Sequence, residues 1–288
     1  MTERRRTMKK KEQMAALVEG HAGMLRCPIC GGAMHVEALK SLVCGNNHSF
    51  DFAKQGYVNM MTRPVKTQYD KNLFQHRRAF ILESGFYRKM HEEVSGIVSR
   101  LQGRPLVLDA GSGEGSHLDR ILDGVDGVGI GVDIAKEGIM LAAKHYPHSM
   151  WFVGDLAKLP IRDGSVDAIV NILSPANYVE FNRVLSSDGL VVKVVPESGY
   201  LKELREALYK DTDRETYDNT GTVSLFEENY EIVERRRVTD EMTLDRTALE
   251  HLIEMSPLTW NHASGELDDF IAADKTVTLD LEIQVGRR

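Results

Sequence analysis

The sequence predicts an α/β protein: a doubly wound, Rossmann-like parallel sheet preceded by a small metal-binding module. Three observations lead to this prediction. A short apolar strand, a glycine turn and a helix follow one another over residues 106–122, and a second strand ends at Asp133. Three cysteines and a histidine gather within residues 27–48. The 288 residues suffice for one large domain and one small one.

Charge is distributed unevenly along the chain. The net charge is −7, which taken alone argues against a nucleic-acid partner. Residues 1–104, however, hold 18 of the 36 basic and 9 of the 43 acidic side chains, a net charge of +9 that leaves −16 for residues 105–288. A basic front half therefore keeps an RNA partner open.

The chain opens on a basic segment, residues 1–13, with almost no apolar content. We expect residues 1–23 to form a basic mobile extension, either a solvated tail or an arm that contacts RNA. No apolar run reaches the roughly 18 to 20 residues that span a bilayer, and the N-terminus shows no signal-peptide core. These features predict a cytoplasmic protein without a membrane partner.

The cysteines predict a zinc site. Cys27 and Cys30 form one close pair, and Cys44 and His48 form a second one thirteen residues later. Two pairs on tight turns supply the four ligands of tetrahedral Zn²⁺ and leave no open position, so the site is expected to be structural. Three clustered cysteines are poor material for disulfides and indicate a reducing compartment. We assign residues 24–61 to this module.

Apolar anchors follow the metal ligands: Phe50, Phe52, Tyr57 and Val58. They either pack the module and dock it on the larger domain, or stack on unpaired bases; packing is the preferred interpretation. Residues 62–104 are expected to form a polar linker and two leading helices, over 74–82 and 90–101.

The third region, residues 105–288, alternates strands and helices. Strands are predicted at 106–109, 128–133, 150–153, 166–172 and 190–195, and helices at 116–122, 135–145 and 178–185. Two further strands, at 230–238 and 276–285, flank a helix at 244–255 and would form an antiparallel hairpin at one sheet edge. An acid before the glycine turn, its G-x-G-x-G spacing and this hairpin favour a class I methyltransferase sheet over an NAD-binding domain, the alternative for such a turn.

Within that resemblance to class I methyltransferases, S-adenosylmethionine is the cofactor. Gly111 and Gly113 let the backbone approach it, Asp133 binds its ribose, and Asp155 with Leu156 lies by its adenine ring. Plain strand-end or turn roles are the alternative for these carboxylates. The two domains together imply more than either one alone.

From Leu25 onward the chain resembles the bacterial 23S rRNA (guanine-N1)-methyltransferases, which modify one stem-loop near the peptide exit tunnel. The resemblance is carried by the four metal ligands and by residues 50–59, 77–80, 85–87, 109–115, 201–209 and 255–260. It implies that the zinc ribbon recognises RNA, that the protein is a homodimer, and that Tyr87, Gly113 and Glu114 touch the cofactor. It also implies a cofactor contact at Tyr200, where relatives can carry His. Part of the family confers macrolide resistance.

The loop after the fourth predicted strand, residues 171–176, is where methyltransferases acting on base nitrogens hold their target. Ser174 and Asn177 are candidates to hydrogen-bond the base there, and an ordinary turn is the alternative. Neither is a convincing general base. Two other functions stay open: a small-molecule methyltransferase whose ribbon is only structural, and a zinc-dependent RNA-binding protein without catalysis.

Overall fold

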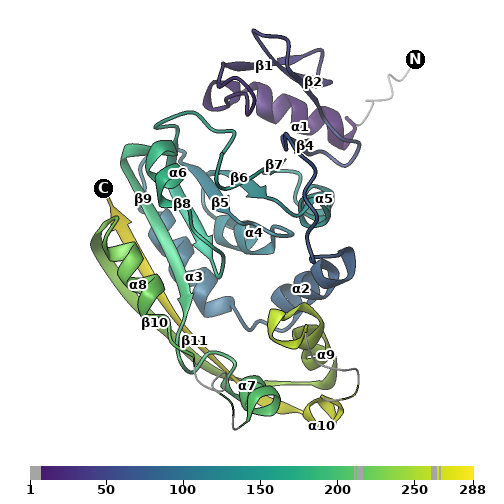
Figure 1. Cartoon of the computed structure of the whole chain (residues 1–288), viewed down its shortest axis with the longest axis vertical. Coiled ribbons are helices and arrows are strands. Elements are labelled where there is room, and N and C mark those ends of the chain that lie inside the picture. Colours follow the sequence, from purple (N-terminus) through teal and green to yellow (C-terminus); the bar gives the residue numbers. More distant parts are fainter. Residues whose placement is uncertain (1–7, 211, 213–216, 261–264, 266) are drawn as a thin grey trace.

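The computed structural model describes residues 8–210, 212, 217–260, 265 and 267–288, and it contains two sheets (Figure 1). The small antiparallel sheet has the order β1-β2-β3, with strands Met34–Glu37, Ser41–Cys44 and Ser49–Asp51. The large sheet has eight strands in the order β10-β11-β9-β8-β5-β6-β7-β4. Its strands are β4 (Val58–Asn59), β5 (Leu106–Ala110), β6 (Val128–Asp133), β7 (Met150–Val153), β8 (Val166–Ile172), β9 (Leu185–Pro196), β10 (Glu231–Leu244) and β11 (Lys275–Arg287).

The central strands are parallel, as expected for apolar strands covered by helices on both faces. The chain winds outward from β5 in both directions, so the strand order switches between β5 and β8. In open α/β sheets, ligands bind outside the carboxyl ends of the strands at such a switch point. Antiparallel β11 and β10 complete the sheet beyond β9, which confirms the predicted hairpin and the class I methyltransferase fold.

Helices cover the sheet on both sides. Side chains alternate across a strand, so Val192 and Val194 of β9 enter one apolar core while Val191 enters the other. The helices are α2 (Lys71–Glu83), α3 (Arg88–Val98), α4 (Ser116–Leu122), α5 (Lys136–His145), α6 (Tyr178–Val184), α7 (Lys202–Tyr209), α8 (Thr220–Glu227), α9 (Arg246–Met255) and α10 (Asp268–Ile271), with a 3₁₀ turn at Pro257–Thr259. The predicted helices differ from these by a few residues at their ends.

The N-terminal extension is not the mobile arm that its composition predicts. Residues Lys10–Glu19 form helix α1, and a 3₁₀ turn, Ala22–Met24, follows it. Met14, Ala15 and Val18 are buried, because their spacing places them on one side of the helix against the ribbon. The prediction is therefore wrong for residues 10–23, and residues 1–7 lie outside the described part of the chain.

The zinc ribbon shares its core with the large domain. Phe52, Tyr57 and Val58 are buried, which favours packing over base stacking for these anchors. The ribbon's last segment, β4, pairs in parallel with β7 and so extends the large sheet. A backbone bridge from Leu25 to Ile161 adds a second attachment. Figure 1 shows the ribbon and α1 together at one end of the molecule, beside β7.

Among the described residues, no helix is both long and apolar enough to cross a bilayer.

The first prediction concerns Gly138 in α5. A Cβ there would lie 2.8 Å from the backbone of Gly113, so α5 could remain only by moving away from the glycine turn. We expect Gly138→Ala to destabilise the protein by about 1–3 kcal/mol. Gly96→Ala in α3 is the matched control, since nothing lies within 4 Å of its Cβ. It should stabilise by about 0.4–1 kcal/mol. Urea unfolding measures both; equal stabilities for the two variants would contradict the close packing of α5.

Candidate functional site

The four predicted metal ligands meet in space. The Sγ atoms of Cys27, Cys30 and Cys44 and a ring nitrogen of His48 all lie within 4.8 Å of one another. The Cys30 and Cys44 sulfurs are 3.7 Å apart, and His48 Nδ1 lies 3.5 Å from the Cys27 sulfur and 3.4 Å from the Cys44 sulfur. Zn–S and Zn–N bonds of about 2.3 and 2.0 Å give tetrahedral edges of about 3.8 and 3.5 Å. The cluster therefore fits a structural zinc ion.

Backbone turns prepare the ligands for a metal. The Gly32 amide is the main group that lowers the pKa of Cys30 to about 6, which favours the thiolate that binds zinc. Gly31 and Asn47 adopt left-handed conformations, with φ of 74° and 61°, so that each pair sits on a tight turn. Both ligand pairs thus lie on tight turns, as predicted.

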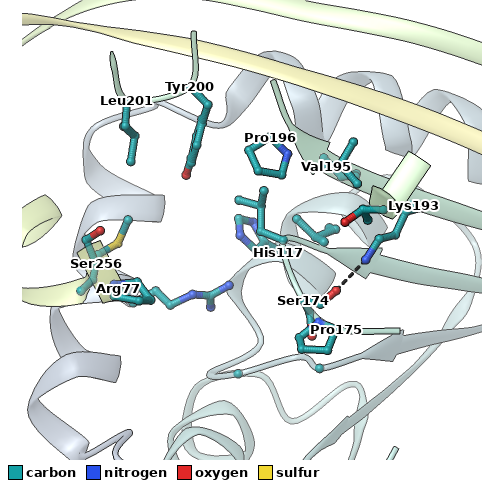
Figure 2. Close-up of a pocket in the computed structure, with 18 of the residues that line it drawn as sticks. Arg77, His117, Ser174, Pro175, Lys193, Val195, Pro196, Tyr200, Leu201 and Ser256 are labelled. Atoms are coloured by element: carbon teal, nitrogen blue, oxygen red, sulfur yellow. Dashed lines mark hydrogen bonds between the residues drawn. The ribbon is translucent and has the colours of Figure 1, made fainter. Parts of the chain in front are cut away.

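A cavity of about 670 Å³ opens at the carboxyl ends of β5, β6, β8 and β9. Figure 2 shows part of its lining, with side chains from several elements pointing toward a common space. The predicted residues that line it are Tyr87, Gly111, Gly113, Asp133, Ser174 and Tyr200. The structure thereby brings together residues that lie up to 113 positions apart in the chain. The size lies within the usual range of cofactor pockets.

The glycine turn is built for close approach. Gly111 and Gly113 have φ of 88° and 57°, which glycine adopts without strain. A Cβ at Gly111 would lie 2.0 Å from the Ser174 hydroxyl oxygen. Asp133 connects the turn to the next helix, because its carboxylate accepts from the Gly113 amide at 2.8 Å and from the Ala135 amide at 2.7 Å. Burial raises the pKa of the Asp133 carboxyl, and the hydrogen bonds from these two amides act in the opposite direction and lower it.

A buried ion pair holds α2 against this turn. The Arg77 guanidinium on α2 binds the carboxylate of Glu114, which is fully buried and does not line the cavity itself. Glu114 also accepts from the Ser116 amide at 3.4 Å. Arg77 does line the cavity, and its guanidinium lies 3.0 Å from the Cβ position at Gly113. Glu114 therefore positions a cation beside the turn.

Two tyrosines meet across the cavity. The hydroxyl groups of Tyr87 and Tyr200 are 2.5 Å apart, and burial raises the pKa of both, so both are neutral at pH 7. Below them, His91 and His117 share a hydrogen bond of 2.8 Å. Burial lowers the pKa of His91 to about 4 and that of His117 well below its usual value, so this pair is neutral as well.

The loop after β8 forms another wall. Asn171 Nδ2 donates to the carbonyls of Ala110, at 2.6 Å, and Pro175, at 3.1 Å, and so ties the loop to the end of β5. Leu173 has a left-handed φ of 49°, a strained conformation for a branched residue and one that clusters at functional sites. Ser174 lines the cavity beside the glycine turn.

Four predicted residues lie outside the cavity lining: Glu114, described above, and Asn177, Asp155 and Leu156. Asn177 caps α6, since its side-chain oxygen accepts from the Glu180 amide at 3.1 Å, which supports the structural role for this residue. Asp155 is exposed and accepts from the Ala157 amide at 2.9 Å, as in an ordinary turn. Leu156 lies closer, with its Cδ1 3.9 Å from the Cβ position at Gly111.

Sequence reasoning assigned no role to several polar residues that line the cavity: Arg77, His117, Lys193, Arg205 and Tyr217. Lys193 had a readable signal, because a lysine inside the apolar run 190–195 is unusual in a buried strand. Arg205 stacks over the ring of Tyr217 at 5.1 Å, a contact that no sequence pattern announces.

Comparisons with known proteins agree with both domains. A family model described as "RlmA, N-terminal", a zinc ribbon, matches residues 25–71, and a model described as "Methyltransferase domain" matches residues 107–189. A solved S-adenosylmethionine-dependent methyltransferase from Geobacter sulfurreducens, in complex with S-adenosyl-L-homocysteine, is 12% identical with a TM-score of 0.49. It covers 76% of this chain and 99% of its own.

Two relatives extend over nearly the whole chain. A Bacillus subtilis (strain 168) protein, named as a candidate 23S rRNA (guanine-N1)-methyltransferase, is 39% identical over 92% of this chain and 97% of its own length. The 23S rRNA (guanine(748)-N(1))-methyltransferase of Streptomyces fradiae is 33% identical over 86% of this chain and 90% of its own. With the zinc ribbon, the methyltransferase sheet and the cavity at its switch point, these matches show that the chain belongs to the 23S rRNA (guanine-N1)-methyltransferases.

Proposed function

We propose that this protein methylates N1 of a guanine in a stem-loop of 23S rRNA near the peptide exit tunnel. One observation carries the proposal beyond family membership. A single cavity is lined by the glycine turn and Asp133 and, directly beside that turn, by the loop after β8, Leu173–Ala176. A methyl donor at the turn and a base at the loop would therefore share one space. Bringing donor and acceptor to attack distance supplies much of the rate enhancement.

The residues present fit S-adenosylmethionine. Asp133 holds carboxylate oxygens at the end of β6, where two ribose hydroxyls can donate to them. Gly111 and Gly113 leave the backbone open to the ligand, and Tyr87 and Tyr200 lie across the cavity. When bound, the cofactor supplies an electrophilic methyl group on a sulfonium sulfur. The remaining predicted contacts, from Glu114, Asp155 and Leu156, are part of this proposal, with Glu114 acting through Arg77.

The substrate places its own demands on the site. Guanine N1 carries a proton at neutral pH and lies on the Watson–Crick edge, so the base must be unpaired or flipped before it can react. Tyr69 of the linker and Leu225 of α8 line the cavity and are both exposed, so they offer apolar surface to such a base. Aromatic surfaces stack well on unpaired bases.

RNA recognition is proposed for the ribbon, and it places the enzyme in the cytoplasm with the ribosome. The ribbon belongs to the basic half of the chain, net +9, and its attachment through β4 sets it rigidly beside the catalytic sheet. The family resemblance also leads us to propose a homodimer, which sedimentation at micromolar concentration would test; a monomer at that concentration would rule it out.

The reaction itself can be tested directly. Purified protein with labelled S-adenosylmethionine should transfer methyl to a 23S rRNA fragment that lacks the modification. Primer extension should then stop at the methylated guanine, because an N1 methyl group blocks the pairing edge. The assay also reports which of the neighbouring loop guanines is the target. If the protein transfers methyl to none of the unmodified 23S fragments, the proposal is wrong.

Zinc removal should separate RNA binding from cofactor binding. Cys30 is the exposed ligand, so Cys30→Ser removes a thiolate without leaving a cavity in the core. We expect loss of bound zinc and weaker RNA binding, with S-adenosylmethionine affinity unchanged. Ala33→Ser is the control, since it adds a hydroxyl to the same ribbon at an exposed position that is not a ligand. Normal RNA methylation by zinc-free Cys30→Ser would favour a purely structural ribbon.

The ribose contact makes a further prediction. Asp133→Ala should weaken S-adenosylmethionine binding by about 10- to 100-fold, the effect of losing hydrogen bonds to a charged group. Asp126→Ala is the matched control, because that carboxylate lies just before the same strand and its side chain is 86% exposed. Calorimetry measures both affinities. Equal affinities for the two variants would remove Asp133 from the cofactor site.

A further inference from the structure

Lys193 is a buried cation that faces the cavity. It lies in β9 and is only 3% exposed, yet its side chain lines the pocket. Strand pairing places it in register with Asn171 of β8 and Gln284 of β11, both fully buried. Directly paired residues project from the same face of a sheet, so the three form a polar row across otherwise apolar strands. A polar row in such a core needs an explanation.

The hydrogen bonds of Lys193 leave one donor free. Its Nζ donates to Asn171 Oδ1 at 2.5 Å. It also donates to the Ser174 carbonyl at 2.6 Å, the dashed line in Figure 2. An ammonium has three N–H groups, and in the described part of the chain Lys193 makes no third hydrogen bond, although Gln284, its partner in the row, has an Oε1 without a hydrogen bond. Gln284 does not compete for the same partners, because its amide nitrogen donates to Glu282 at 2.6 Å. One N–H of Lys193 is therefore available to a ligand.

No carboxylate forms an ion pair with Lys193 in the described residues. Burial alone lowers its pKa, to about 8, so the ammonium still predominates at pH 7. A buried charge without a counterion is costly to fold, and such groups concentrate at functional sites. A ligand that becomes negatively charged during the reaction would supply the counterion that Lys193 lacks.

Lys193 also lies next to the methyl-donor side of the cavity. The carbonyl it binds belongs to Ser174, whose hydroxyl oxygen packs against the Cβ position of Gly111 in the glycine turn. Ser174 thus contacts both the ammonium and the glycine turn, which holds the cofactor in the proposed function. A base that reacts with a methyl group at this turn would present its neighbouring atoms to Lys193.

We propose that the free N–H of the Lys193 ammonium binds O6 of the target guanine and stabilises the negative charge that N1 deprotonation spreads onto that oxygen. This inference rests on the proposed function and names a catalytic residue for it. It is the same use of a preorganised donor that an oxyanion hole makes.

The step balances as follows. The N1–H bond breaks, its proton leaves to water in the open cavity, and the resulting charge is shared between N1 and O6. The N1 electron pair then forms the bond to the methyl carbon, and the carbon–sulfur bond breaks with its pair remaining on sulfur. The methyl carbon arrives in the ring plane, along the direction that the N1–H bond occupied. A cation at O6 therefore assists both stages without blocking the attack.

The experiment compares single-turnover methyl transfer to the 23S fragment in wild type, Lys193→Met and Lys193→Arg. We expect Lys193→Met to lose about 10²–10³-fold in rate, the effect of removing one donor to a developing oxyanion. Equilibrium affinities for S-adenosylmethionine and RNA should stay near wild type, which also verifies folding. Lys193→Arg should recover part of the rate because it keeps the charge. Gln284→Met is the matched control from the same polar row and should keep nearly full rate.

A pH profile below pH 8 separates this role from a structural one. With Lys193 present, O6 contact lowers the pKa of N1, so the rate levels off at a lower pH than in Lys193→Met. A merely structural lysine would lower the rate and leave the profile unmoved. The other ionisable groups around the row and the cavity are the same in both proteins, including Asp109, whose pKa burial raises to about 7: Tyr69, Arg77, Tyr87, Asp109, His117, Asp133, Tyr178, Tyr200, Arg205, Tyr217 and Glu282.

The possible results have distinct meanings. An upward shift of the profile in Lys193→Met, with partial rescue by Lys193→Arg, supports the proposal. An unshifted profile, or a Lys193→Met rate close to wild type, overturns the role of Lys193 and leaves the proposed function intact. Absence of transfer by the wild-type protein would instead overturn the proposed function.

Discussion

Three elements pack so closely on the turn at residues 111–115 that its glycines have no room for a side chain. Cβ atoms at Gly111 and Gly115 would lie 2.0 and 2.4 Å from Ser174 and Trp151, and the Gly113 backbone lies 2.8 Å from the Cβ position of Gly138. The loop after β8, strand β7 and helix α5 are thus placed by contact with the same short stretch of backbone. Every distance in the cavity follows from this packing, because interiors at crystal-like density transmit small displacements.

The ribbon depends on the same sheet. Alone, a three-stranded sheet of this length could bury little apolar surface, and the metal would carry most of its stability. Here Leu42 and Phe52 of the ribbon join a core that continues through Met14 of α1 to Phe152 of β7. The orientation of the metal site is therefore set by the catalytic domain. In the proposed function, the basic front half, residues 1–104, and the acidic domain, residues 105–288, act on a single RNA.

Periodicity and spacing predicted most of the fold, including strands Met150–Val153 and Val166–Ile172 at their observed bounds. Spacing also predicted the zinc ligands, because the site draws its four ligands from two pairs that are each close in sequence. The prediction of a mobile N-terminus was wrong because it relied on the basic composition of residues 4–11 and gave no weight to the three apolar side chains that α1 buries, Met14, Ala15 and Val18. Arg77, Lys193 and Arg205 escaped sequence reasoning because their roles arise from strand register and helix packing, which bring distant residues together. Asn177 was a candidate by position, and its side chain is used to begin α6.

Charge in the cavity runs opposite to charge in the domain around it. Residues 105–288 carry a net charge of −16, whereas the described cavity lining holds three cations, Arg77, Lys193 and Arg205, against the single carboxylate Asp133. Arg77 is neutralised by Glu114, whereas Lys193 of β9 and Arg205 of α7 have no ion-pair partner in the described residues. An acidic exterior repels RNA that approaches without the ribbon, while a cationic interior favours a base that has lost its proton. In this proposal, the negative charge outside the cavity contributes to selecting the substrate, and the positive charge inside it contributes to activating N1.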